Sequence, residues 1–375
     1  MIQSWKEELQ NNITKLEDLK DPFSIPPEEW ADLKTVITRH PMNITRYYAS
    51  LIDLKDPKDP IRRMCIPHIE ELDGTGSYDT SGEESNTVLS GVQHKYPQTA
   101  LVLTTNICFM YCRHCFRKRL VGYTRDEILS RRREAVEYIW DHKEIDNVLL
   151  SGGDFLTLNN AQIAEYFKEL TRISHLDFIR MGSRIPVVFP MRISEDTELL
   201  DIFEKYNQKK RIMLVSQFNH PRELTNESIA AIRAVQETGV DVLNQTVLLK
   251  GINDSVETLT ALMKGLMRIA VTPYYIFQCR PVKHVTQHFQ IPINQGIELV
   301  NVVRDQLSGP SKQFRYAMSH PRGKIELLGK IGEETIFKFA QAKARSDANK
   351  MFARKMGNAG WLDPDLNPTP SLTSA

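Results

Sequence analysis

The stretch ALVLTTNICFMYCRHCFRKRL, residues 100–120, carries the strongest signal in this sequence. Its apolar start, residues 100–105, predicts a buried strand, because the run is short, lacks the alternation of a half-exposed strand and ends in polar residues. Cys108, Cys112 and Cys115 follow at once with the spacing C-x3-C-x2-C. A loop that leaves a strand end can bring three thiolates around one metal centre, and three thiolates suit three corners of a four-iron cluster.

Other interpretations of the three cysteines are weaker. Zinc normally takes four ligands, and the only nearby candidate, His114, is awkwardly spaced between two of the cysteines. Purely hydrophobic packing fits poorly beside Arg113, Arg117, Lys118 and Arg119. With three cysteine ligands, one iron stays open to the amino and carboxylate groups of S-adenosylmethionine. Electron transfer into the sulfonium then yields a 5'-deoxyadenosyl radical, a reaction that the cofactor supplies and the protein positions.

Outward from this stretch, short apolar runs recur, and each is followed by a helical pattern. The runs are ALVLTT, DNVLLSGG, FIRMGSR, IMLVSQF, VLNQTVLL and YYIFQC. Six strand–helix repeats predict an α/β barrel or partial barrel with its reactive groups at the carboxyl ends of the strands. Polar residues occur at or near those ends, and the candidate site residues among them are Gly152, Gly153, Asp154, Ser183, Arg184 and Gln245.

Composition limits the remaining possibilities. The chain has 375 residues, 41% of them hydrophobic, and a formal charge of +1, so it can bury a large core and has no overall field that would attract nucleic acid or anionic lipid. No apolar run approaches a membrane span, and the start MIQSWKEELQ lacks a secretory signal, which predicts a cytoplasmic location. Five cysteines are too few and too unevenly spaced for a disulfide-stabilised secreted protein.

We expect four regions along the chain. Residues 1–95 predict a helical arm followed by a linker, the linker being rich in Gly, Ser, Thr and acidic residues from about 72 to 92. Residues 96–300 form the barrel. Residues 301–355 are expected to hold two strands and then a charged helix over 334–355, and residues 356–375 a disordered tail.

Six segments together resemble the lysine 2,3-aminomutase family of radical S-adenosylmethionine enzymes. They are CFMYCRHCFRKR, LLSGGDFLTL, RMGSRIPVVFPMRI, QFNHPRELT, NQTVLLKGIND and PYYIFQC, and the likeness runs from about Trp5 to Lys324. The resemblance implies a (β/α)6 partial barrel of the TIM type with an N-terminal helical arm. It also implies a [4Fe-4S] cluster, S-adenosylmethionine, pyridoxal 5'-phosphate on a lysine, and transfer of an α-amino group to the β carbon.

Carried over by position, the resemblance assigns roles to individual residues. The cluster is held by Cys108, Cys112 and Cys115. S-adenosylmethionine is surrounded by the six strand-end candidates named above, which are Gly152, Gly153, Asp154, Ser183, Arg184 and Gln245. Arg117 matches the arginine that binds the substrate carboxylate, a task for which a fork-shaped permanent cation is suited. Lys324 matches the pyridoxal lysine.

The chain departs from the family pattern around that lysine. SHPRGK stands where the family has PGGGGK, so Lys324 could instead be a surface lysine on a turn between two strands. Lys95 and Thr99 occupy the positions of two arginines that anchor the cofactor phosphate; Lys95 can still act as a point charge, but the bidentate geometry is lost. No cysteine follows Cys279, so the family's zinc-binding tail is missing, and we expect a homo-oligomer without a zinc site.

The substrate positions differ as well. Arg280 and, approximately, Ala317 replace two aspartates that grip the distal ammonium of lysine. Free L-lysine is therefore disfavoured, and glutamate or another acidic amino acid becomes plausible. The alternative is that Arg280 pairs with an acid of the protein itself.

Three hypotheses follow from these patterns. The first is a 2,3-aminomutase that acts on an amino acid other than free L-lysine, such as glutamate or another acidic amino acid, and receives electrons from a flavodoxin- or ferredoxin-type donor. The second is a radical enzyme without pyridoxal phosphate that epimerises its substrate or modifies a side chain or peptide C–H bond. The third is a non-catalytic iron–sulfur protein, against which the strand-end polar residues argue.

Overall fold

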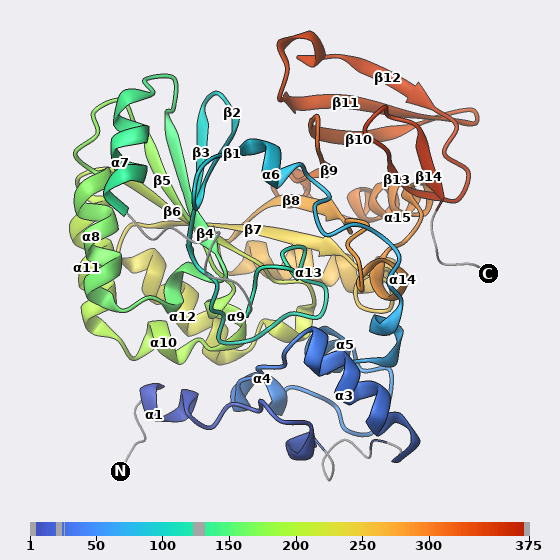
Figure 1. The fold of residues 1–375 in the computed structure, drawn as a ribbon, viewed down its shortest axis with the longest axis horizontal. Helices are drawn as coiled ribbons and strands as arrows, with labels where there is room; N and C mark the ends of the chain where they lie inside the picture. The colour runs from blue at the N-terminus through green and yellow to red at the C-terminus, as the bar shows by residue number, and fades with distance from the viewer. Residues whose placement is uncertain (1–4, 20–24, 26, 123–131, 371–375) are drawn as a thin grey trace.

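A computed structural model describes residues 5–19, 25, 27–122 and 132–370 of the chain (Figure 1). Its core is one sheet of twelve strands that follow one another in chain order. Seven of them are parallel neighbours: β3 (Thr99–Thr105), β4 (Asn147–Gly152), β5 (Phe178–Gly182), β6 (Arg211–Ser216), β7 (Asp241–Leu248), β8 (Thr272–Gln278) and β9 (Arg315–His320). The six predicted barrel strands are β3 to β8, and β9 continues the same parallel order.

Helices connect the parallel strands and cover the outer face of the sheet (Figure 1). They are α7 (Arg132–Asp141), α8 (Asn160–Leu170), α9 (Ile185–Val188), α10 (Met191–Ser194), α11 (Thr197–Asn207), α12 (Asn226–Glu237), α13 (Val256–Arg268), α14 (Thr286–Phe289) and α15 (Ile293–Asp305). Side-chain caps define the starts of the longer ones; Asn159, for example, accepts from the backbone N–H of Gln162 and opens α8. The predicted α/β partial barrel is confirmed.

The N-terminal arm lies beneath the barrel in Figure 1 and packs against loops that leave the strand ends. It contains α1 (Trp5–Leu9), α3 (Trp30–Arg39), α4 (Arg46–Ser50), α5 (Pro60–Cys65) and the short 3-10 helix η3 (Ile69–Leu72). The side-chain amide of Asn43 donates to the backbone oxygen of Cys108 at 3.0 Å. The backbone N–H of Arg113 donates to the backbone oxygen of Met64 at 2.9 Å. The arm therefore supports the cysteine loop directly.

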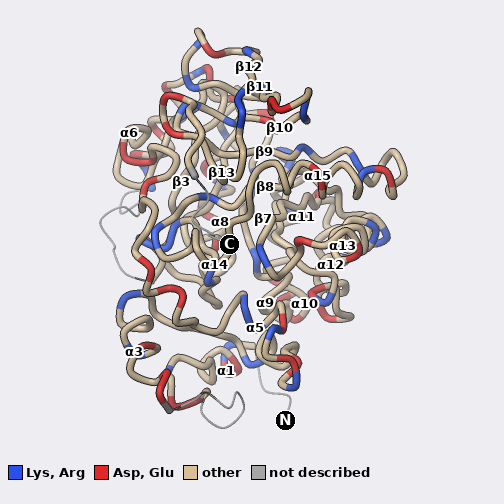
Figure 2. The backbone as a smooth tube through the Cα atoms, turned by 90° about the vertical axis from the view of Figure 1, so that its right-hand side faces the viewer, with Lys and Arg blue, Asp and Glu red and all other residues tan. Residues whose placement is uncertain are grey.

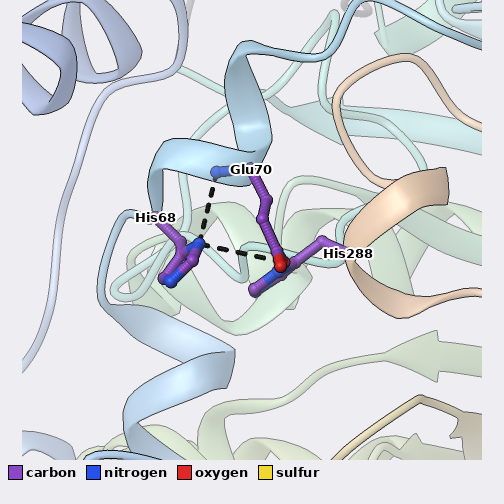
Figure 3. A group of neighbouring side chains, drawn as sticks. All are labelled: His68, Glu70 and His288. Atoms are coloured by element: carbon purple, nitrogen blue, oxygen red, sulfur yellow. Dashed lines mark hydrogen bonds and ion pairs between the residues drawn. The ribbon is translucent and has the colours of Figure 1, made fainter.

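A three-residue cluster joins the arm to the barrel (Figure 3). His68 is the N-cap of η3, Glu70 lies within η3, and His288 comes from α14. Nδ1–H of His288 donates to the Glu70 carboxylate. The rings of His68 and His288 are stacked, with centroids 4.9 Å apart and planes 23° apart. Because nitrogen lone pairs lie in the ring planes, nearly parallel rings do not aim them at one common ion. We interpret the cluster as a hydrogen-bonded link rather than a metal site.

Two of the three predicted boundaries fall inside elements, and the third, at 355/356, falls between β12 (Met351–Arg354) and β13 (Ala359–Leu362). β2 (Val92–Tyr96) crosses the boundary at 95/96 and pairs antiparallel with β3, and α15 crosses the one at 300/301. The predicted linker contains α6 (Glu83–Asn86) and β1 (Thr87–Leu89). Its backbone is ordered by Asp79, whose carboxylate accepts from the backbone N–H groups of Ser81, Glu83 and Glu84.

The predicted C-terminal helix is wrong. Residues 334–355 include β11 (Glu334–Ala342) and β12 (Met351–Arg354). β11 pairs antiparallel with β10 (Gly323–Ile331), and β12 pairs antiparallel with β11. The tail, expected to be disordered, includes a second small sheet of β13 (Ala359–Leu362) and β14 (Pro368–Pro370), and Trp361 within it is buried. Residues 371–375 lie outside the described chain.

Charge is spread evenly over the fold. Lys and Arg alternate with Asp and Glu along the arm, the barrel and the C-terminal strands (Figure 2). This mixture matches the formal charge of +1. Among the described residues, no helix combines the length and apolar character that a membrane span requires.

Candidate active site

The cysteine loop begins at the carboxyl end of β3, level with the end of β4. Thr105 is the register partner of Gly152, and the backbone N–H of Gly153 donates to the oxygen of Thr105 at 2.5 Å. A Cβ added to Gly153 would lie 2.3 Å from the oxygen of Ile107, and Gly152 has a φ of +117°. The two glycines are therefore needed for the close approach of this backbone to the cysteine loop.

The three thiols of the loop suit a cluster that replaces their protons. Burial raises the pKa of Cys115 to about 11 and that of Cys108 well above its usual range. Thiols in such surroundings become ligands when a bound cationic centre compensates the charge of the thiolates. The sulfur of Cys112 accepts from Nη1 of Arg184 at 2.8 Å. All three cysteines line the cavity described below, so a cluster bound by them would face it.

A buried carboxylate fixes the far side of the loop. Glu71 in η3 accepts from Arg113 Nη2 at 2.6 Å, from Arg113 Nε at 2.8 Å and from Lys118 Nζ at 2.5 Å. Burial would raise the pKa of Glu71, but the two cations hold it well below its usual range. The Glu71 side chain is fully buried, so this triad ties the cysteine loop to the arm without solvent screening.

Three of the residues expected around S-adenosylmethionine bind one another. The Asp154 carboxylate accepts from Ser183 Oγ at 2.7 Å and from the backbone N–H of Arg184 at 2.6 Å. The Arg184 guanidinium extends to Cys112 and to Glu223, whose Oε1 is 2.6 Å away. Burial raises the pKa of Asp154 to about 6. Asp154 and Ser183 thus shape the ends of β4 and β5, and Arg184 links β5 to the cysteine loop.

One cavity of about 820 Å³ brings the predicted site residues together. Its lining includes every site residue predicted above: Lys95, Cys108, Cys112, Cys115, Arg117, Gly152, Gly153, Asp154, Ser183, Arg184, Gln245, Arg280 and Lys324. These residues come from β2, from the loops after β3, β4, β5 and β8, and from β7 and β10. A cavity of this size is large enough for a cofactor together with a small substrate.

Lys324 lies in an aromatic and cationic part of the cavity. Its Nζ is 4.2 Å from the ring centroid of Tyr275 and 5.5 Å from that of Phe277. Burial, with further contributions from Arg180, Arg280 and Arg315, lowers the pKa of Lys324 to about 7. A large fraction of this amine is therefore neutral near pH 7 and can act as a nucleophile.

Two more cations share the cavity, and Ser81 connects them. Lys95 Nζ donates to the backbone oxygen of Ser81 at 3.2 Å and to that of His320 at 2.5 Å. Arg280 Nη1 donates to Ser81 Oγ at 3.0 Å. Burial lowers the pKa of Lys95 to about 7 and that of Arg280 to about 10. In the described part of the chain, no carboxylate lies within ion-pair distance of Arg280.

Arg117 is differently placed, because it already has an anionic partner. Its Nε is 3.3 Å from Oε1 of Glu83, and Nη2 of Arg119 is 3.0 Å from the other carboxylate oxygen. The ring of Phe116 lies 4.5 Å from Cζ of Arg117 and 4.1 Å from Cζ of Arg280. Phe116 therefore contacts both arginines expected to bind substrate.

Sequence reasoning missed several residues that line the cavity. Glu83 and Ser81 lie in the segment expected to be a linker, where Asp79, four residues before Glu83, was the available signal for an ordered turn. Arg180 lies inside the apolar run FIRMG, and a charged residue within a buried strand was itself a signal. Asn147, at the start of β4, had no comparable signal.

Comparison with known proteins agrees with this geometry. Residues 102–263 match the model of the Radical SAM superfamily. A protein of Aquifex aeolicus named "Putative L-lysine 2,3-aminomutase" is 44% identical over 92% of this chain and 93% of its own length. The L-lysine 2,3-aminomutase of Acetoanaerobium sticklandii is 38% identical over 81% of this chain and 73% of its own. The glutamate 2,3-aminomutase of Clostridioides difficile is 36% identical over 85% of this chain and 75% of its own length. The chain therefore belongs to the lysine 2,3-aminomutase family of radical S-adenosylmethionine enzymes.

Proposed function

We propose that this protein is a 2,3-aminomutase that moves the α-amino group of an acidic amino acid to the β carbon. Membership of the radical S-adenosylmethionine superfamily implies a [4Fe-4S] cluster and S-adenosylmethionine. The observation that carries the proposal is the single cavity that the three cysteines, Arg117, Lys324 and Arg280 all line. An electron carrier would need no cavity with an amine nucleophile and two guanidinium groups.

The residues divide the work within the cavity. When bound, the cluster with S-adenosylmethionine supplies the radical that removes a substrate hydrogen, and pyridoxal phosphate on Lys324 carries the migrating amino group. Arg117 binds the α-carboxylate, and Arg280 binds the distal carboxylate. The rings of Tyr275 and Phe277 keep the Lys324 amine desolvated and partly neutral, so that it can form and release the bond to the cofactor.

Arg280 supports an acidic substrate rather than lysine. Its half-buried guanidinium donates to a neutral hydroxyl, Ser81 Oγ, and Lys95 donates to the backbone oxygen of the same serine. A substrate ammonium ~4 Å from this guanidinium would be repelled by about 4 kcal/mol in partly solvated surroundings, whereas a carboxylate would be attracted by a similar amount. The relative from Clostridioides difficile that is named glutamate 2,3-aminomutase supports a substrate of this class.

The setting of the reaction belongs to the proposal as well. We infer a cytoplasmic enzyme reduced by a flavodoxin- or ferredoxin-type donor, and a homo-oligomer assembled without a zinc site. Size-exclusion chromatography with light scattering tests the oligomer. A metal analysis of the anaerobically purified protein tests for iron without zinc.

The central experiment offers L-glutamate and L-lysine separately to anaerobically reconstituted protein with S-adenosylmethionine, pyridoxal phosphate and dithionite. We expect β-glutamate from L-glutamate and at most traces of β-lysine from L-lysine, measured by chromatography and mass spectrometry. Arg280→Gln should raise the KM for L-glutamate roughly 10-fold or more. The control is Arg211→Gln, an exposed arginine paired with Asp241.

The same assay tests the rival chemistry. With deuterated L-glutamate, label in 5'-deoxyadenosine without a β-amino product would favour a radical enzyme that works without an amino shift. A reduced protein that leaves S-adenosylmethionine intact would contradict radical catalysis altogether.

A further inference from the structure

Arg180 is a half-buried cation of the cavity that the proposed roles leave unused. It is the third residue of β5, and its side chain lines the cavity. Nη2 donates to Oδ1 of Asn147 at 2.5 Å, while the buried Nε has no hydrogen-bond partner. Within the described ranges, no carboxylate lies within ion-pair distance of this guanidinium. A buried N–H donor of a cation lowers the stability of the folded protein when it has no acceptor, and a bound anionic ligand could supply that acceptor.

Asn147 holds Arg180 in one direction. The Asn147 amide nitrogen donates to the backbone oxygen of Gln98 at 2.9 Å, to Thr99 Oγ1 at 3.1 Å and to Asp146 Oδ1 at 2.7 Å. With its nitrogen committed on that side, the amide presents its oxygen to the guanidinium. Arg180 is thereby oriented before any ligand binds, which lowers the entropic cost of binding one.

Lys324 lines the same cavity as Arg180 and adds to its positive charge when the amine is protonated. Arg180 is the charged neighbour that contributes most to lowering the pKa of Lys324. Nζ of Lys324 contacts the faces of Tyr275 and Phe277, and no carboxylate of the described chain lies within ion-pair distance of it. Protonated Lys324 and Arg180 repel each other, and an anion bound in this part of the cavity would reduce that repulsion.

We propose that Arg180, oriented by Asn147, anchors an oxyanion subsite of the cavity that is separate from the Arg117–Glu83 pair. The chemical class of its ligand is a phosphate or carboxylate group. Two molecules of the proposed function carry such a group: pyridoxal phosphate has a phosphate, and the acidic substrate has a distal carboxylate. In this respect the proposal rests on the proposed function. The phosphate fits better, because it carries close to two negative charges and matches the guanidinium fork bidentately.

The test compares wild type with Arg180→Met and Arg180→Lys. Binding of pyridoxal phosphate and of pyridoxal, which lacks the phosphate, is measured by absorbance titration, and binding of inorganic phosphate and L-glutamate by calorimetry. We expect Arg180→Met to weaken pyridoxal phosphate roughly 10- to 100-fold and to leave pyridoxal unchanged. Inorganic phosphate should compete with pyridoxal phosphate in wild type and much less in the variant. Arg180→Lys should fall between, since it keeps the charge and loses the fork.

Arg315→Met is the matched control. Arg315 also acts electrostatically on Lys324, but it is half-exposed, is paired with Glu326 at 3.1 Å and does not line the cavity. It should leave the affinities for pyridoxal phosphate and inorganic phosphate unchanged. If circular dichroism shows that Arg180→Met is unfolded, the affinities of Arg180→Lys and Arg315→Met for the same ligands are compared instead.

Each outcome decides the proposal. Selective loss of L-glutamate affinity with unchanged pyridoxal phosphate affinity would keep the subsite and assign it to the substrate. Equal losses for pyridoxal phosphate and pyridoxal, or no loss for any probe, would overturn it. A protein that binds phosphate through Arg180 yet forms no β-amino acid would keep the subsite and contradict the proposed function.

Discussion

Arg117 is paired with Glu83 across 3.3 Å, so the residue proposed to bind the substrate carboxylate is already in contact with a carboxylate of the chain. Glu83 is 6% exposed and lies in α6, next to the antiparallel strands at one edge of the sheet. Its second oxygen binds Arg119. A substrate carboxylate must therefore share Arg117 with Glu83 or displace it.

Neutralising Glu83 should strengthen carboxylate binding. In Glu83→Gln the amide keeps the size of the side chain but removes the charge that competes for Arg117. We expect the Kd of the reconstituted protein for L-glutamate, measured by calorimetry, to fall about 3- to 10-fold, which corresponds to roughly 1 kcal/mol. The exposed neighbour Glu84→Gln is the control and should have no effect. Weaker binding in Glu83→Gln would mean that Glu83 positions Arg117 productively rather than competing with the ligand.

Covalent attachment of the cofactor should follow the unusual acidity of Lys324. Its pKa of about 7 is below the ordinary lysine value, so the nucleophilic neutral amine accumulates as the pH rises through about 7 rather than through about 10. Borohydride reduction after mixing with pyridoxal phosphate, followed by peptide mass spectrometry, should trap label on Lys324 with that pH dependence. Lys324→Ala should abolish the label, and Lys330→Ala, which removes a lysine paired with Glu298, should not. Label elsewhere, or a midpoint near 10, would contradict this environment.

The Glu71 triad should stabilise the cysteine loop and make it sensitive to acid. Glu71→Gln leaves Arg113 and Lys118 buried without their anion, which should lower the free energy of unfolding by about 3–5 kcal/mol. Because the folded pKa of Glu71 is depressed, its contribution is present above the unfolded value of ~4.3 and is lost as the pH falls below it. Denaturant unfolding at several pH values under anaerobic conditions measures both effects.

The exposed Glu17→Gln serves as the control for Glu71→Gln. Equal stability of the two variants, or a loss from Glu71→Gln that does not shrink in acid, would contradict the proposed role of the triad.

A methyl group at Gly153 should disturb the cysteine loop without unfolding the barrel. Its Cβ would lie 2.3 Å from the oxygen of Ile107, one residue before Cys108, and backbone cannot yield as a flexible side chain does. We expect Gly153→Ala to cost roughly 1–3 kcal/mol and to lower the iron bound per chain after reconstitution. Gly309→Ala, whose Cβ meets no atom within 4 Å, should bind iron like wild type. Full iron occupancy in Gly153→Ala would show that the loop tolerates the shift.

The errors of sequence reasoning have a common physical origin. Residues 334–342 look helical by their charges, yet Thr335, Phe337 and Phe339 are buried at a period of two. That alternation is stable only because β10 supplies a partner, with Phe337 opposite Leu327. Trp361 in the tail is buried by contacts that no local pattern encodes. Such strands form only when a partner strand is present, whereas an amphipathic helix can be predicted from the local spacing of its apolar residues.

The sequence by itself determined the parallel core and identified the three cysteines as candidate cluster ligands. Strands buried on both faces are locally apolar, and three ligands of one metal centre can be close in sequence, so both features survive in a linear pattern. Only the tertiary structure decided the electrostatics of the site. It paired Arg117 with Glu83, left Arg280 and Arg180 with no acid of the described residues within ion-pair distance, and surrounded Lys324 with rings and cations. These relationships join β2, β5, β8, β10 and α6, and charges far apart in sequence interact only after the sheet has closed around one cavity.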